Sequence, residues 1–339
     1  MQTIGVIGAG AWGTALAQML SAGGRDVLLW AREPEVVESI NTRHENTLYL
    51  PSAVLDENLK ATESLHEAAQ RDVLLLVTPA QHVRATLKSI RSELSEGKTL
   101  VICAKGIELE SGLLLSQVCE EVVPDANLAV LTGPTFASEI AKGLPGAVTI
   151  GVKDKDVGAE LQDLLGVKGF RPYVTDDMIG VQLGGAIKNV IAIACGVVYG
   201  RQLGESARAA LLTRGVAEIA RLGVAMGAKK DTLLGMCGIG DLMLTASSMQ
   251  SRNFSLGAAL GEGQSMESIL SQRNAVTEGV HTAQSTLALA EKYAVDMPIT
   301  SAVYKCLHEG MAVDDAIEQM LNRPFKYDMA GKETRKKEI

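Results

Sequence analysis

Aromatic residues and positive charge are both scarce in this chain of 339 residues. Phe, Trp and Tyr make up 4% of it, and 32 Lys and Arg face 40 Asp and Glu, so the formal net charge is −8. Proteins that bind nucleic acids combine basic surfaces with aromatic stacking platforms, and this composition offers neither. We therefore expect no nucleic-acid partner.

Residues spaced for metal binding or disulfide exchange are also missing. The five cysteines are odd in number, widely scattered and never spaced C-x-x-C, and the five histidines share no metal-ligand spacing. We expect no metal and no catalytic histidine. A reducing, cytoplasmic compartment suits this cysteine usage best.

We expect neither a leader peptide nor a membrane span. An apolar segment begins within three residues of Met1, and no basic region lies ahead of it. Residues 178–200 are long and apolar, but Gln182, Lys188 and Asn189 lie in the middle of the segment. One Lys costs about 2.5–3.5 kcal/mol at the centre of a bilayer. We expect a buried helix there, and no integral membrane segment.

The first half of the sequence alternates strand-like and helix-like segments. Apolar runs that are typical of strands occupy residues 3–8, 26–31, 72–78, 99–104, 127–132 and 147–152. Amphipathic segments lie between them, among them 14–22, 35–42 and 82–94. Several runs are apolar on both faces, as in parallel strands that helices cover on both sides. The pattern predicts a doubly wound, Rossmann-type α/β domain over residues 1–177.

The pattern changes after Asp177, where long segments rich in Ala, Leu, Ile and Met replace the strand-like runs. We expect an all-α domain over residues 178–324. The predicted helices are 178–199, 206–227, 231–235, 241–247, 252–261, 266–271, 282–293, 299–308 and 313–321. The tail 325–339 is charged and poor in apolar residues, so we expect it to be disordered.

A glycine-rich segment follows the first predicted strand. Residues 8–13 read GAGAWG, and a helix is expected to begin near Ala11. This is the G-x-G-x-x-G pattern in the strand–turn–helix setting of a dinucleotide site. Gly8 allows a tight turn, Gly10 lets the backbone approach a pyrophosphate, and Gly13 lets helix and strand pack closely. The alternative is a glycine-rich turn without a ligand, although such a turn does not require all three glycines.

The second predicted strand ends without the carboxylate that usually binds the ribose hydroxyl of NAD. Its last residues are Ala31 and Arg32, and the first acidic residue is Glu33. Arg32 is placed to pair with a 2′-phosphate, which favours NADPH or the use of both cofactors. The alternative is an exposed arginine in a turn.

Two lysines are candidates for the proton transfer that accompanies hydride transfer to or from a nicotinamide cofactor. Lys188 lies in an apolar helical segment, so we expect its ammonium to be partly desolvated. Burial and a second cation would both lower its pKa. Lys105 could be that cation, because it follows the strand 99–104 at the sheet edge where such folds bind ligands. The alternatives are a Lys188 that reaches solvent and an ordinary lysine at a strand end.

Three more segments carry candidate residues. The segment GIGD at 238–241 follows no strand and predicts a loop that enters a helix, with Asp241 as the N-cap. Ser251, Arg252 and Asn253 begin a predicted helix, where a guanidinium and an amide could clamp a phosphate. Alternatively, Ser251 caps the helix and the next two residues face solvent. Pro134 is predicted at the first position of another helix.

Eight segments, in order, resemble the NAD(P)-dependent glycerol-3-phosphate dehydrogenases of the soluble bacterial type. The similarity covers nearly the whole chain. The segments are GAGAWGTALA at 8–17, CAKGIE at 103–108, LTGPTFASEIAKGLP at 131–145, GVQLGGAIKNVIAIACG at 180–196, RAALLTRGVAEIARLG at 208–223, GIGDLMLT at 238–245, QSRN at 250–253 and VTEG at 276–279. The resemblance implies reversible reduction of dihydroxyacetone phosphate to sn-glycerol 3-phosphate with NADPH or NADH, which supplies glycerophospholipid synthesis.

The resemblance also implies roles for individual residues. It makes Lys188 the catalytic acid/base, with Asp241 beside it to orient it and Thr245 one turn further along the same helix face. The expected substrate ligands are Lys105, Gly133, Thr135, Lys188, Asp241, Thr245, Ser251, Arg252 and Asn253. The expected cofactor ligands include the glycine-rich segment and Arg32 described above. The full set is Gly8, Gly10, Ala11, Trp12, Gly13, Arg32, Lys105, Ala137, Arg252, Val276 and Glu278.

This chain has Ala11 where many relatives have Ser, so it lacks one hydroxyl for the pyrophosphate.

Two other functions stay open: a related two-domain hydroxyacid dehydrogenase and a non-catalytic dinucleotide sensor. An Arg–Asn phosphate clamp argues against the first, and Lys188 beside an anion-binding segment argues against the second. The expected partner is the small-molecule substrate, and a homodimer is left open.

Overall fold

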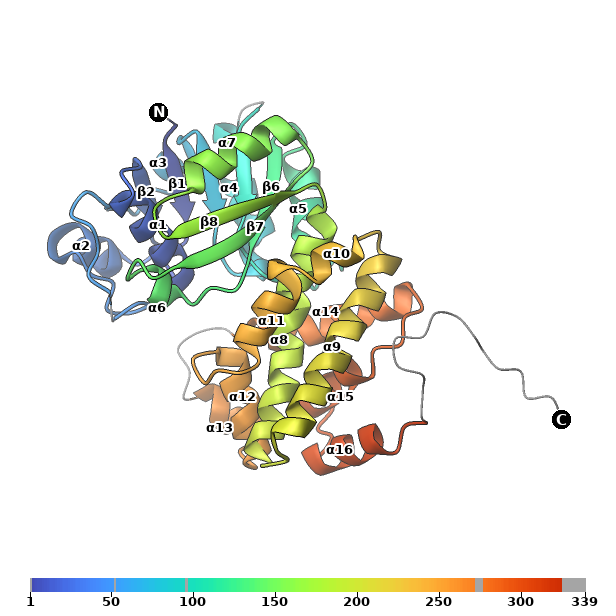
Figure 1. Cartoon of the computed structure of the whole chain (residues 1–339). Coiled ribbons are helices and arrows are strands. Elements are labelled where there is room, and N and C mark those ends of the chain that lie inside the picture. The colour runs from blue at the N-terminus through green and yellow to red at the C-terminus, as the bar shows by residue number, and fades with distance from the viewer. Residues whose placement is uncertain (1, 52, 95–96, 272–276, 325–339) are drawn as a thin grey trace.

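The computed structural model describes residues 2–51, 53–94, 97–271 and 277–324, and there a sheet domain is followed by a helical domain (Figure 1). The fold class expected from the sequence is confirmed. The last strand ends at Thr175 and the next helix begins at Met178. The predicted division at 177/178 falls in the connection between them. The predicted disordered tail, 325–339, lies outside the described residues.

Eight strands form one sheet in the order β3-β2-β1-β4-β5-β6-β7-β8. Strands β1 to β6 pair in parallel, whereas β7 is antiparallel to β6 and β8 is parallel to β7. The order reverses between β1 and β4, and open sheets bind ligands at the carboxyl ends of the strands at such a point. The bounds are β1 (Ile4–Ile7), β2 (Val27–Trp30), β3 (Lys60–Thr62), β4 (Val73–Leu76), β5 (Thr99–Ile102), β6 (Asn127–Thr132), β7 (Gly146–Val152) and β8 (Phe170–Thr175).

The sequence predicted six of these strands and missed the two at the edges of the sheet. Strand β3 has only three residues, one of which is buried. Strand β8 reads FRPYVT and alternates buried with exposed residues, and it contains Pro172. An edge strand tolerates proline, because one side of it has no hydrogen-bonding neighbour. Short or interrupted apolar patterns of this kind carry too little signal to stand out in a sequence.

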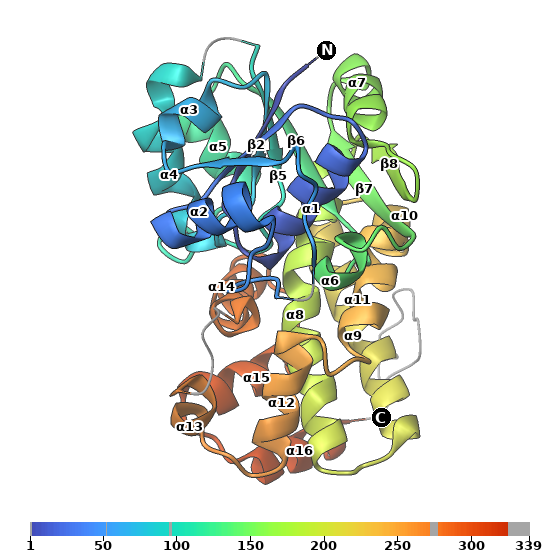
Figure 2. The same cartoon turned by 90° about the vertical axis from the view of Figure 1, so that its left-hand side faces the viewer.

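Helices cover both faces of the sheet (Figures 1 and 2). One face packs against α1 (Ala11–Ala22), α2 (Pro34–Arg43), α6 (Ala137–Ile140) and α7 (Lys155–Leu165). The other packs against α3 (Leu65–Ala69), α4 (Val83–Ser89), α5 (Leu115–Val122) and the start of α8 (Met178–Gly200). The predicted helix 82–94 is split into α4 and two short 3₁₀ turns, η1 (Ala80–His82) and η2 (Arg91–Glu93).

Helix α8 runs from the sheet domain through the middle of the helical domain (Figures 1 and 2). By length and composition it could cross a membrane, but 94% of its most apolar 18-residue window is buried inside the protein. The prediction of a buried helix is confirmed. No strand follows Thr175 in the described residues; instead come α9 (Glu205–Ala225), α10 (Lys230–Leu233), a π-helical turn η3 (Met236–Gly240), α11 (Asp241–Thr245), α12 (Arg252–Gly261), α13 (Met266–Ser271), α14 (Glu278–Lys292), α15 (Pro298–His308) and α16 (Val313–Leu321).

Helices α8 and α12 meet backbone to backbone. A Cβ atom on Gly257 would lie 1.9 Å from the carbonyl oxygen of Ile193, and one on Gly196 would lie 2.1 Å from that of Phe254. Any side chain at either position would force the helices apart. This close contact sets the distance between Lys188 on α8 and Arg252 at the start of α12.

Replacing Gly257 by Ala should therefore destabilise the helical domain. We expect Gly257→Ala to lower the free energy of unfolding by about 2–4 kcal/mol, because the added methyl group overlaps a backbone oxygen that cannot move alone. Urea unfolding measures this change. Gly240→Ala is the matched control: Gly240 is helical and its added Cβ would meet nothing closer than 3.5 Å. Equal losses for the two variants would contradict the backbone-contact account.

Candidate functional site

The three glycines of the segment after β1 serve three different geometric needs. Gly8 has φ of +120°, which L side chains rarely adopt. A Cβ on Gly13 would lie 1.9 Å from the carbonyl oxygen of Gly8, so no side chain fits between turn and helix. A Cβ on Gly10 would meet no atom within 4 Å. The protein itself does not need glycine at position 10, and the free space there suits a ligand that approaches the backbone.

Helix α1 offers its N-terminus to the same space. Gly10 is its N-cap, no side chain caps the helix, and its first turn has no acidic residue. The first backbone N–H groups, including those of Ala11 and Trp12, therefore remain available to an anion. The segment fits the pyrophosphate of a dinucleotide.

A buried asparagine that the sequence analysis missed holds this turn. The Asn46 amide donates to the Ala9 carbonyl (2.9 Å) and to the Thr14 hydroxyl (2.8 Å). The Thr14 hydroxyl donates to the same carbonyl (3.0 Å). Asn46 lies in a polar loop, and nothing in its local sequence distinguishes it from a solvent-exposed residue.

Two buried polar groups beside this turn have no partner among the described residues. They are the indole N–H of Trp12 and the hydroxyl of Thr78. Thr78 follows β4, and the preceding residue, Val77, donates to the Ile7 carbonyl of β1 (3.0 Å). Thr78 therefore lies at the point where the strand order reverses.

Arg32 lies one residue beyond the end of β2, which ends at Trp30 and is followed by Ala31. Its side chain is 83% exposed and pairs with Glu33 at 3.2 Å. Glu33 also accepts a hydrogen bond from the Tyr49 hydroxyl (3.2 Å). Arg32 can thus reach a ligand by giving up one exposed contact, whereas Glu33 is contacted by both Arg32 and Tyr49.

One buried carboxylate joins the two lysines of the sequence analysis. Lys188 Nζ lies 2.6 Å from Asp241 Oδ1 and donates to the Thr245 hydroxyl at 2.7 Å. Lys105 Nζ lies 2.8 Å from the other oxygen, Asp241 Oδ2. Asp241 is fully buried, and Lys105 follows β5 in the sheet domain while Lys188 belongs to α8. The site therefore lies between the two domains.

The surroundings of Lys188 bring its pKa down to about 7 from the usual 10.5. Burial is the largest cause, because it disfavours the charged ammonium. Asp241 opposes the effect by attracting the charge, and the ammonium of Lys105 adds to it. An amine with this pKa can both give up and accept a proton near neutral pH.

The N-cap prediction for Asp241 is wrong. The cap position is Gly240, and Asp241 is the first residue of α11. The residues before it form the π-helical turn η3 rather than a loop. The Asp241 side chain points to the two lysines instead of the helix N–H groups, because pairing with two cations outweighs one capping hydrogen bond.

The segment 251–253 differs in part from both sequence readings. Ser251 caps α12 by accepting a hydrogen bond from Phe254 N (3.2 Å), and Arg252 is exposed. Asn253, however, is buried: its amide donates to Asn189 Oδ1 (3.0 Å), and its oxygen accepts from Gly279 N (3.0 Å). Asn253 thus links α8, α12 and α14, which rules out the alternative in which it faces solvent.

Glu278, a predicted cofactor ligand, begins α14 and faces the sheet domain. Its carboxylate accepts a hydrogen bond from the backbone N–H of Ala80 and attracts the guanidinium of Arg252. Burial raises its pKa above the usual value. Glu278 therefore lies at the same domain boundary as Lys105. Val276, also predicted to bind the cofactor, lies outside the described residues.

The remaining predicted residues follow β6. A Cβ on Gly133 would lie 2.7 Å from the Ala147 carbonyl oxygen of β7, which requires glycine there. The Thr135 hydroxyl donates to the Gly133 carbonyl (3.3 Å). Pro134 is not the first residue of a helix as predicted: α6 begins at Ala137, so only Ala137 is at a helix start.

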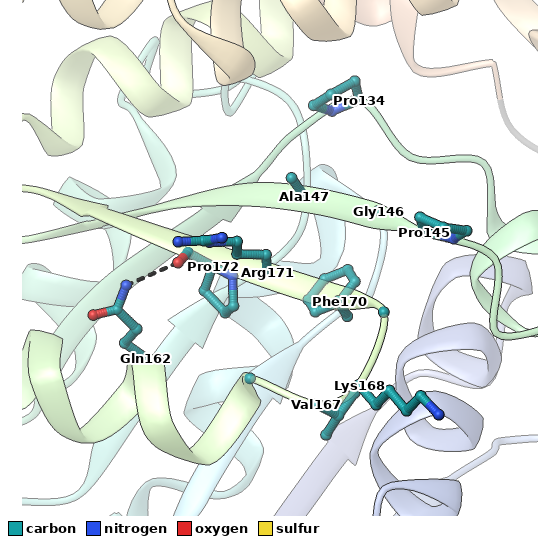
Figure 3. A pocket seen from close by; sticks show the side chains of 12 residues that line it. Pro134, Pro145, Gly146, Ala147, Gln162, Val167, Lys168, Phe170, Arg171 and Pro172 are labelled. Carbon is teal, nitrogen blue, oxygen red and sulfur yellow. Dashed lines mark hydrogen bonds between the residues drawn. The ribbon is translucent and has the colours of Figure 1, made fainter.

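A large open hollow on the sheet domain borders this site at Pro134, the residue between Gly133 and Thr135. It has a volume of about 990 Å³ and borders the edge strand β8 (Figure 3). Gln162 closes one side by donating to the Pro172 carbonyl (2.9 Å), as the dashed line shows. None of the predicted site residues lines it. In the described part of the chain, no group of three or more His, Cys, Asp or Glu side chains could hold a metal ion.

Two family models match most of the chain. Residues 3–158 match the N-terminal model of NAD-dependent glycerol-3-phosphate dehydrogenase, and residues 177–318 match its C-terminal model. The chain is 53% identical to glycerol-3-phosphate dehydrogenase [NAD(P)+] of Parvibaculum lavamentivorans, covering 95% of this chain and 97% of the relative. It is 51% identical to the protein of the same name from Maricaulis maris, covering 97% and 99%. The crystal structure of glycerol-3-phosphate dehydrogenase from Coxiella burnetii superimposes with a TM-score of 0.91 at 36% identity, covering 95% and 99%.

The open space at Gly10 leads to a test of the glycine-rich turn. Gly10→Ala should leave thermal unfolding unchanged, because the methyl group meets no protein atom, but it should weaken NADPH binding about tenfold or more by filling the space for the pyrophosphate. Gly13→Ala is the matched control and should lower the unfolding temperature. Calorimetry and fluorescence titration measure the two effects. Unchanged cofactor affinity in Gly10→Ala would place the pyrophosphate elsewhere.

Proposed function

This chain belongs to the NAD-dependent glycerol-3-phosphate dehydrogenase family, and we propose on that premise that Lys188 is the acid/base with which it interconverts dihydroxyacetone phosphate and sn-glycerol 3-phosphate. The chain is an NAD(P)-dependent oxidoreductase. The single observation that supports the assignment of Lys188 is its buried contact with Asp241 and Thr245, beside Lys105. A structural lysine would not need a second ammonium next to it.

The chain's own residues bind the substrate and handle the proton, while reduced nicotinamide supplies the hydride. As the carbonyl carbon gains hydride, Lys188 Nζ donates a proton to the carbonyl oxygen. Asp241 and Thr245 hold Nζ in place, so little reorganisation is needed during the step. In the reverse direction, neutral Lys188 takes the proton from the hydroxyl group. A pKa of about 7 allows both directions.

We assign the substrate phosphate to Arg252 and the residues around it. Arg252 is exposed at the start of α12, where a guanidinium and the N-terminus of a helix favour a dianion. The Asn253 amide uses one N–H on Asn189, which leaves the other for the phosphate. Ser251 serves as the helix cap. Lys105, Gly133 and Thr135 remain proposed ligands on the sheet side of the same site.

The two other functions left open by the sequence are not favoured. Relatives of 48–53% identity over 95–97% of this chain carry the name glycerol-3-phosphate dehydrogenase [NAD(P)+]. A dinucleotide sensor without catalysis would have no use for a buried lysine with a pKa near neutrality. We also propose a cytoplasmic location, to which the five free cysteines are suited. A homodimer is still left open.

Lys188 should control the pH dependence of the reaction. Reduction needs the protonated amine, so kcat/KM for dihydroxyacetone phosphate should fall as the pH rises through about 7, whereas the rate of glycerol-3-phosphate oxidation should rise. Lys188→Met should lower kcat by roughly 10²–10⁴-fold, the usual loss for a general acid, without loss of NADPH binding. Stopped-flow NADPH oxidation measures the rate of reduction, NADP+ reduction measures the reverse rate, and fluorescence titration measures NADPH binding. A folded variant that binds NADPH and reacts within a few-fold of the parent would exclude Lys188.

Arg32 should discriminate between the two cofactors. A charge-assisted contact with the 2′-phosphate is worth about 1.5–3 kcal/mol, so Arg32→Ala should weaken NADPH binding roughly ten- to a hundredfold and leave NADH binding nearly unchanged. Dissociation constants for the two cofactors give the ratio. If both affinities fall equally, Arg32 is not the 2′-phosphate ligand.

A further inference from the structure

The segment after Lys105 forms a tight turn that belongs to both domains. Ile107 and Leu114 form an antiparallel bridge, Glu108 N donates to the Leu113 carbonyl (3.0 Å), and Gly112 N donates to the Glu108 carbonyl (2.9 Å). Ile107 and Leu114 are buried in the hydrophobic core of the helical domain. The turn thus extends from the sheet domain into its neighbour.

A buried ion pair holds this turn to the sheet domain. The Arg84 guanidinium on α4 donates from Nε to Glu108 Oε1 (2.9 Å) and from Nη2 to Oε2 (2.8 Å), and the Ser111 hydroxyl donates to Oε2 (2.5 Å). The Glu108 side chain is 7% exposed. Such a bidentate ion pair fixes the orientation of the Glu108 carboxylate as well as its distance from Arg84. Arg84 also pairs with the exposed Glu121 on α5 (2.8 Å).

A neutral side chain braces the backbone of the same turn. The Gln81 amide donates to the Ile107 carbonyl (2.9 Å), and its oxygen accepts from Leu109 N (2.9 Å). A Cβ on Gly106 would lie 2.6 Å from the Cβ of Ala80, so the chain passes close to η1 directly after Lys105. All the residues that hold this turn, Ala80, Gln81 and Arg84, come from the segment 80–84 that follows β4.

We propose that Glu108, held by Arg84, is a positioning residue that fixes Lys105 against Asp241. Glu108 touches neither Lys188 nor Asp241 in the structure, and it acts through the backbone three residues from Lys105. A lysine has a long, flexible side chain, so its ammonium stays at one carboxylate oxygen only when its backbone is anchored. This inference rests on the proposed role of the site.

Loss of the Arg84–Glu108 ion pair should change the charge balance around Lys188. If Lys105 moves away, Asp241 is left to Lys188 alone and the repulsion between the two ammonium groups weakens. Both changes favour the protonated form of Lys188. The charged groups that face Glu108 itself are Arg84 and Lys88 on α4, and Arg84 is in turn shared with Glu121 on α5. None of them touches Lys188, so the effect must pass through Lys105.

Glu108→Gln and Arg84→Gln test the proposal in the full-length enzyme. We expect about a tenfold loss of kcat/KM for dihydroxyacetone phosphate, because a misplacement near 1 Å at a reacting centre is costly. The pH at which kcat/KM falls should move upward by about half a unit or more. A brief pulse of acetic anhydride, read by mass spectrometry, should label Lys105 several-fold faster in both variants. This last readout needs no activity and therefore separates failure of the brace from failure of the proposed reaction.

Two controls separate positioning from general stability. Glu121→Gln removes the exposed half of the Arg84 contacts and should change none of the readouts. Glu218→Gln removes a buried carboxylate in the helical domain that accepts from Ile299 N (2.7 Å) and Thr300 N (3.2 Å). It should lower stability without moving the pH midpoint. If Glu108→Gln fails to fold, Arg84→Lys, which keeps the charge and loses the two-pronged geometry, takes its place. An unmoved midpoint with unchanged Lys105 labelling in the folded variants would overturn the proposal.

Discussion

The Asp241 carboxylate is the constraint on which the other features of the site depend. It is fully buried, and each of its oxygens holds an ammonium group from a different domain. A buried lysine without such a partner would pay the full cost of desolvation, and two buried lysines without it would repel each other. With the carboxylate present, one negative charge faces two positive ones. Lys188 is the more deeply buried of the two, and the balance brings its pKa close to neutrality.

This balance requires accurate backbone placement, and the chain achieves it with close contacts between elements. A Cβ on Gly184 of α8 would lie 2.6 Å from the Cys237 carbonyl oxygen of η3, so α8 and the turn before Asp241 meet without side chains between them. Lys188 follows Gly184 by one helical turn. On the sheet side, the turn after β5 holds Lys105 through its contacts with residues 81 and 84. The glycines and the buried ion pair therefore serve the same site.

Much of this arrangement could be predicted from the sequence, because local pattern and tertiary structure agree there. The glycine-rich turn, six of the strands, the burial of α8 and the anchoring of Lys188 in an apolar helix all followed from periodicity and spacing. Asp241 was misassigned as an N-cap, because a capping rule considers only neighbouring residues, whereas its two lysine partners are 53 and 136 residues away in the chain. Asn253 was expected in solvent or on a phosphate, and its partner Asn189 was not considered, although a polar residue beside Lys188 in an apolar run was a usable signal. Asn46 gave no local signal, and Glu108 lies in the segment CAKGIE but was given no role of its own.

Direct titration of the Lys188 amine tests whether burial, Asp241 and Lys105 together set its pKa. Nuclear magnetic resonance of enzyme with isotope-labelled lysine, assigned with Lys188→Met, follows the amine between pH 5 and pH 11 without reference to turnover. We expect a midpoint of about 7 in the parent enzyme. We expect a lower midpoint in Asp241→Asn, where the attracting charge is gone, and a higher one in Lys105→Met, where the repelling charge is gone. A Lys188 that titrates near the usual 10.5, or that does not respond to either substitution, would contradict these roles of burial, Asp241 and Lys105.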